Sequence, residues 1–162
     1  MKKALLVTMI LLFVVMAFAG CGGTVEIKKP APDEGATMFE VEGNCEAVLN
    51  GDILTVSGTT NLMDGTNGTI SVLNSDGMVA EEVKFTKDGD QISHDFTVSN
   101  DWNDIVYGFI TFDTQQADKQ PDAVTEVYGK NFENLEGPAE CVIWDLKGVI
   151  AVFQSEEITI KS

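Results

Sequence analysis

The chain has 162 residues, a length that suits one domain with a short additional segment and can bury a substantial core. Its 10 basic side chains are outnumbered by 26 acidic ones, which gives a formal net charge of −16 at pH 7. Such a surface repels the phosphates of nucleic acids and of anionic lipids, so the composition excludes nucleic-acid binding.

The first residues have the pattern of an export signal. Lys2 and Lys3 precede an apolar run of sixteen residues, Ala4 to Ala19, which is short for a membrane span and typical of a secretory signal. The following Phe18-Ala19-Gly20-Cys21 resembles a bacterial lipobox, in which the cysteine is lipidated and becomes the first residue of the mature chain. An ordinary cleaved signal peptide and an uncleaved membrane anchor are the alternatives.

This resemblance implies three segments: a signal peptide at 1–20, a lipidated Cys21 with a flexible tether at 21–37, and a domain at 38–162. The protein is then exported and held at the bacterial cell membrane or outer membrane. The sixteen tether residues 22–37 include three glycines and two prolines, and a flexible chain of that length spans about 22 Å. We therefore expect the domain to stand clear of the membrane, with Lys28 and Lys29 near its surface.

Two further cysteines, Cys45 and Cys141, remain once Cys21 is assigned to lipid. An exported protein meets an oxidising compartment, where a lone pair of cysteines tends to form a disulfide. We expect a Cys45–Cys141 bond, with two buried thiols as the alternative.

Alternating apolar and polar residues predict strands at 53–57, 69–73, 78–86, 91–99, 105–112, 141–146 and 149–161. Turns that contain glycine separate them, as at Asp64-Gly65 and Lys87-Asp88-Gly89. The spacing predicts an all-β sandwich of about seven or eight strands. We place Val79 and Trp144 on the inward faces of their strands.

One segment departs from the β pattern. Residues 121–128 begin with proline, carry Asp122 and Glu126, and are followed by Gly129, which predicts a short helix. Its apolar stripe, Val124, Val127 and Tyr128, should pack on the sandwich. The whole connection from about residue 114 to 140 is much longer than a hairpin loop.

Two stretches carry a resemblance that covers roughly residues 48–140. Residues 56–66, VSGTTNLMDGT, are similar to a "GTTNLPDGT" stretch found in a group of small bacterial secreted proteins and lipoproteins, with Met63 where proline is usual. A second block of that group is resembled by three stretches: Gln120-Pro121-Asp122-Ala123-Val124, Tyr128-Gly129-Lys130 and Asn134-Leu135-Glu136-Gly137-Pro138. The resemblance implies an immunoglobulin-like or fibronectin-like sandwich and brings no catalytic residues.

Few residues suggest chemistry. His94 is the single histidine and lies in register with core positions, so a transition-metal site or a histidine-based triad lacks most of its parts. Acidic clusters at 101–104 and 88–90 contain oxygen ligands suited to calcium, but without EF-hand spacing they are more often only hydrated. We therefore expect no enzyme, no cofactor and no metal.

The favoured hypothesis is a membrane-anchored, non-catalytic binding or assembly module of the cell envelope with a protein or cell-wall partner. We expect its contact surface on the 114–140 connection and two neighbouring loops, 60–68 and 87–90, at the same end of the sandwich. The residues singled out for that surface are Trp102, Asn131, Phe132 and Asn134. A purely structural envelope lipoprotein is the alternative, followed by a protease inhibitor or a carboxylate-based hydrolase.

Overall fold

The computed structural model describes residues 27–115 and 117–160. The predicted signal at 1–20 and the lipidation at Cys21 lie outside the described residues. Within those residues, no helix is long and apolar enough to cross a membrane.

The described chain is almost entirely β, which confirms the all-β prediction. It has one short helix, α2 (Asp122–Tyr128), and eleven strands. The strands are β1 (Phe39–Glu40), β2 (Gly43–Asn50), β3 (Ile53–Thr60), β4 (Asn67–Asn74), β5 (Val79–Thr86), β6 (Ile92–Thr97), β7 (Ile105–Phe112), β8 (Leu135–Glu136), β9 (Val142–Trp144), β10 (Val149–Gln154) and β11 (Ile158–Thr159).

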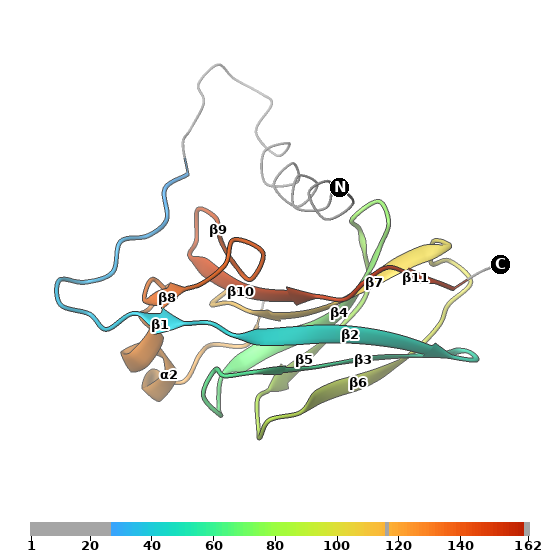
Figure 1. The fold of residues 1–162 in the computed structure, drawn as a ribbon, viewed down its shortest axis with the longest axis horizontal. Coiled ribbons are helices and arrows are strands. Elements are labelled where there is room, and N and C mark those ends of the chain that lie inside the picture. The colour runs from blue at the N-terminus through green and yellow to red at the C-terminus, as the bar shows by residue number, and fades with distance from the viewer. Residues whose placement is uncertain (1–26, 116, 161–162) are drawn as a thin grey trace, which may run out of the picture.

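Two antiparallel sheets form the sandwich (Figure 1). The larger sheet has the order β5-β4-β7-β10-β9, with β11 also paired to β7, and the smaller has the order β2-β3-β6. A separate pair of short parallel strands, β1 and β8, lies beside helix α2. The predicted final strand at 149–161 is interrupted, because Ser155 leaves the ladder and its hydroxyl accepts the Gly108 N–H at 2.9 Å.

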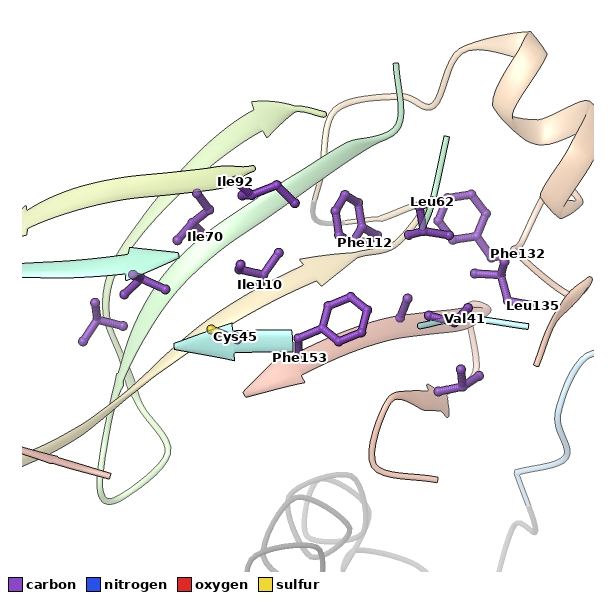
Figure 2. Close-up of a cluster of buried hydrophobic side chains, with 14 of the residues drawn as sticks. Val41, Cys45, Leu62, Ile70, Ile92, Ile110, Phe112, Phe132, Leu135 and Phe153 are labelled. Atoms are coloured by element: carbon purple, nitrogen blue, oxygen red, sulfur yellow. The ribbon is translucent and has the colours of Figure 1, made fainter. Parts of the chain in front are cut away.

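Apolar side chains from both sheets fill the space between them (Figure 2). On β3 every second residue is buried, beginning with Leu54 and Val56, as the period-two pattern predicts. Strand β7 is the central strand, and the structure confirms that it is buried on both faces through Phe109 and Ile110.

The sheets approach closely at Gly108 of β7. A Cβ atom at this position would lie 2.9 Å from both γ carbons of Val56 and 3.2 Å from the Cβ of Ala47. The same close approach lets the Cys45 thiol donate to the Gly108 carbonyl oxygen at 3.6 Å. Glycine is therefore required here for packing rather than for an unusual backbone angle.

Two inward assignments are wrong. Val79 is 56% exposed and Trp144 is 41% exposed. Both lie on the outermost strands of the larger sheet, β5 and β9. A shift in the β4–β5 register between Val72 and Leu73 places Val79 opposite Leu73, off the face of the buried Val72. Trp144 lies on β9, the edge strand of its sheet, where alternation alone does not ensure burial.

The expected disulfide is also absent from the structure, where Cys45 and Cys141 are both free thiols. Cys45 contacts Gly108 on β7, whereas Cys141 lies beside Val152, whose N–H donates to its carbonyl oxygen. Gly108 and Cys141 are two strands apart and three residues apart along the larger sheet, a separation of roughly 14 Å from ordinary strand spacing, and Cys45 contacts Gly108 from the other sheet. A disulfide joins α carbons about 4.4–6.8 Å apart, and in this structure no such bond joins the two cysteines.

Gly108→Ala should lower the free energy of unfolding by about 1–3 kcal/mol, because its methyl group overlaps both methyl groups of Val56. The matched test is a double-mutant cycle with Val56→Ala, measured by urea denaturation. Since Val56→Ala removes the overlapping groups, the double variant should lose less stability than the sum of the two single variants. Strictly additive losses would contradict this packing.

Candidate functional site

Three loops meet at one end of the sandwich, at the lower left in Figure 1. They are the β3–β4 loop (61–66), the β5–β6 loop (87–91) and the connection that contains α2 (113–134), and we call them together the loop platform. Their hydrogen bonds to one another confirm that the three loops lie at the same end, as the sequence predicts.

The first two loops are joined around Lys87. Its side chain is only 5% exposed, and its ammonium group lies 2.6 Å from the carboxylate of Asp64, which is 60% exposed. Two backbone hydrogen bonds of 2.8 Å flank this ion pair, from Gly65 N–H to the Lys87 carbonyl oxygen and from Lys87 N–H to the Thr66 carbonyl oxygen. The hydrogen bond from Lys87 holds the pKa of Asp64 below its ordinary value, with help from the Gly89 N–H.

Gln120 joins the connection to the start of β4. Its side chain is buried, its carbonyl oxygen accepts the Asn67 N–H at 2.9 Å, and its amide group donates to the Asn67 carbonyl oxygen at 2.7 Å. The same amide group donates to the Asp113 carbonyl oxygen at 2.6 Å. The buried Gln120 side chain thus makes the two backbone hydrogen bonds that a neighbouring strand would make with Asn67. It also fixes where the connection leaves the sandwich.

Helix α2 forms where the sequence predicts it, with Pro121 at its N-cap and Gly129, at φ 85°, after its last residue. Val124 and Tyr128 are buried, but the third residue of the predicted stripe, Val127, is 45% exposed. The Tyr128 hydroxyl accepts the Met63 N–H at 2.7 Å, so the helix is bound to the β3–β4 loop.

The N-terminal part of the described chain also packs against the connection. Phe39 N–H and Val41 N–H donate to the carbonyl oxygens of Asn134 and Glu136. Farther upstream, the Lys29 ammonium group donates to the Leu135 carbonyl oxygen at 2.6 Å. The segment predicted as a free tether through residue 37 is therefore attached to the domain at Lys29, while most of residues 31–37 are exposed.

Three of the four residues singled out for the contact surface are buried. Phe132 is fully buried, Asn134 donates its side-chain amide to the Val127 carbonyl oxygen at 3.0 Å, and Trp102 is 4% exposed. Trp102 also lies beyond the far end of β6, so it is at the opposite end of the sandwich from the platform. Only Asn131 is exposed. Loop position alone did not reveal this burial, because the connection contributes its own side chains to the core.

The charged side chains exposed on the platform are mainly acidic. Six exposed carboxylates occur within its three loops, against two exposed lysines, Lys119 and Lys130. The acidic residues are Asp64, Asp88, Asp90, Asp118, Asp122 and Glu126. Sequence reasoning missed them as surface residues, although the turn signals around Asp64 and Asp88 indicated exposed loops. The platform therefore presents an acidic rim over a hydrogen-bonded base.

Side chains considered for metal binding or catalysis have local structural roles. His94 is half-buried with its ring 4.7 Å from that of Phe96, and Asn103 N–H donates to the Asn74 side chain at 2.8 Å. Among residues 27–115 and 117–160, no group of three or more histidine, cysteine, aspartate or glutamate side chains is arranged to hold a metal ion.

Comparison with models of known protein families, with curated proteins and with solved structures finds no match for this chain.

Tyr128→Phe should lower the free energy of unfolding by about 1–3 kcal/mol, because the substitution leaves the Met63 N–H without its acceptor. Tyr107→Phe, a change at a half-buried tyrosine of β7, is the matched control and should have a smaller effect in urea denaturation. Equal losses for the two variants would show that this hydrogen bond does not stabilise the platform.

The Asp64–Lys87 pair predicts a dependence of stability on pH. Because folding lowers the pKa of Asp64 from 3.8, the ionised carboxylate stabilises the protein above pH 3.8, and this contribution is lost as the pH falls through the lower folded value. Asp64→Asn should therefore reduce Tm slightly at pH 7, and its difference from wild type should disappear at strongly acidic pH. A difference that stays constant across the titration, or equals that of Asp88→Asn, would refute the assignment.

Proposed function

We propose that this protein is an exported, non-catalytic binding or assembly module of the cell envelope, anchored through lipid at Cys21, and that the loop platform contacts its partner. The observation that carries the proposal is the bonding between the three loops. Lys87 and Tyr128 each tie one loop to another and Gln120 ties the connection to the start of β4, while the acidic residues of the platform remain exposed. Such a surface is ordered before it binds, so less conformational entropy is lost on association.

The charge of the platform indicates the chemistry of the partner. Two of the six exposed carboxylates, Asp64 and Asp118, pair with lysines of this chain, and the other four favour a protein surface or cell-wall polymer that presents amino or guanidinium groups. Attraction between such surfaces increases the association rate and weakens as salt is added. The partner is therefore expected to be basic where it meets the loops.

Reversing charge on the platform tests this function. Asp88→Lys combined with Glu126→Lys should reduce the amount of partner that is crosslinked in intact cells and purified with the protein, because both side chains are exposed on the platform. Glu156→Lys combined with Glu157→Lys changes the net charge equally at the opposite end, between β10 and β11, and should leave capture unchanged.

If both double variants retain the wild-type partners, the platform is not the contact surface. If wild-type protein captures no specific partner, a purely structural envelope role replaces the binding function. Added salt during purification without crosslinking should weaken wild-type capture.

The anchor has its own test. Cys21→Ala should release the protein from the membrane fraction or leave an uncleaved precursor, because the acceptor of the lipid is removed. Intact-mass measurement of the wild-type protein should show a chain that begins at Cys21 and carries acyl groups. An unmodified mature chain would eliminate lipid anchoring.

A further inference from the structure

We propose that the turn between β9 and β10, with Trp144 and Leu146 exposed, rests on the lipid layer that holds the anchor. This inference rests on the proposed lipidation of Cys21. It adds an orientation: one margin of the sandwich faces the membrane, and the opposite margin faces away from it.

The turn exposes two large apolar side chains close together in sequence. Trp144 is 41% exposed and Leu146 is 61% exposed, and both belong to the outermost strand of the larger sheet or the turn that follows it. The turn itself is well ordered, because Asp145 accepts the N–H groups of Lys147 and Gly148. The apolar side chains are thus held outward on a fixed support.

The described chain begins beside this patch, which limits how far the patch can lie from Cys21. The indole N–H of Trp144 donates to the Ile27 carbonyl oxygen at 3.2 Å, so the chain reaches the domain at the patch itself. In Figure 1 the blue start of the described chain lies on the same side of the sandwich as β9. Ile27 is the sixth residue after Cys21. Even fully extended, six residues span about 20 Å, and a flexible chain of that length would span about 13 Å.

This distance replaces the expectation that the domain stands clear of the membrane. With the lipid at Cys21 and Ile27 beside Trp144, the patch cannot move farther from the head groups than the six residues allow. Tryptophan favours the boundary between head groups and acyl chains, because its apolar ring can enter the acyl layer while its N–H finds a polar partner. Lys147 directly follows Leu146, and Lys28 directly follows Ile27, whose carbonyl oxygen bonds Trp144; both lysines are exposed and can extend toward lipid phosphates.

The arrangement also agrees with the charge of the platform. Strands β9 and β5 are the two margins of the larger sheet, four strand spacings or about 19 Å apart. With β9 at the membrane, β5 and the loop that follows it point away, so Asp88 and Asp90 are kept from anionic lipid. The platform is then accessible to a partner outside the membrane.

Quenching of tryptophan fluorescence by brominated phosphatidylcholine tests the contact, because bromine quenches only at short range. The purified, lipidated full chain is reconstituted in vesicles with brominated or ordinary acyl chains, and flotation reports anchoring separately. We expect wild-type protein to float and to lose emission in the brominated vesicles. Trp144→Phe, which leaves the buried Trp102, should float and lose none.

Leu146→Glu should float but be quenched less, because a charge then enters the lipid contact. Val48→Glu is the matched control, since Val48 is 58% exposed on β2 of the other sheet, and it should be quenched like wild type. Floating wild-type protein with unquenched emission would overturn the contact and leave the anchor intact. Wild-type protein that does not float would overturn the anchor and the contact together.

Discussion

The close approach of the two sheets at Gly108 is the constraint on which the rest of the structure depends. Strand β7 carries this residue and pairs with β4 on one side and with β10 and β11 on the other, so its distance from the smaller sheet positions most of the larger one. The lack of a side chain brings Val56 and Cys45 against the β7 backbone. Burial there raises the pKa of Cys45 to about 12, so the thiol stays neutral.

The packing of the strands fixes where the loops of the platform begin. Strands β3, β5 and β7 all run toward the platform, so their following loops begin at fixed points. Lys87, Gln120 and Tyr128 then make the contacts that strand pairing cannot make beyond the sheet ends. A long connection with so many internal hydrogen bonds behaves as an extension of the core, which explains why Phe132 and Asn134 are buried in it.

Much of the sandwich could be predicted from the sequence because strand alternation and glycine turns are local signals. The helix was predictable for the same reason, from Pro121 and Gly129. The exposure of Trp144 was not, since it depends on which strand ends up at a margin. The binding of Lys29 to Leu135 joins residues 106 positions apart, and no local pattern indicates such a contact.

The candidate site, like the fold, could be predicted from the sequence only in part. Its three loops could be grouped from the expected topology, and their hydrogen bonds agree with that grouping. The residues chosen for contact could not be chosen well, because aromatic and amide side chains in a long loop serve the core as readily as a partner. The composition predicts an acidic surface, but only the fold shows which carboxylates lie together on the platform and so indicate a partner.

The first residues of the described chain are held against the domain. The described chain contacts the domain at Ile27, Lys29 and β1, which leaves little slack before residue 27. Under the lipid anchor that we propose at Cys21, these contacts would set both the height and the orientation of the sandwich. The proposed contact surface, the loop platform, would then face away from the membrane in a defined orientation.

The most direct test of this claim is photo-crosslinking in intact cells from single exposed positions. A photoreactive amino acid at position 126, on α2, should form a discrete adduct with one partner, whereas the same amino acid at position 156 should not. Adducts of equal yield and identity from both positions, or none from position 126 and its neighbours on the platform, would contradict the proposed contact surface.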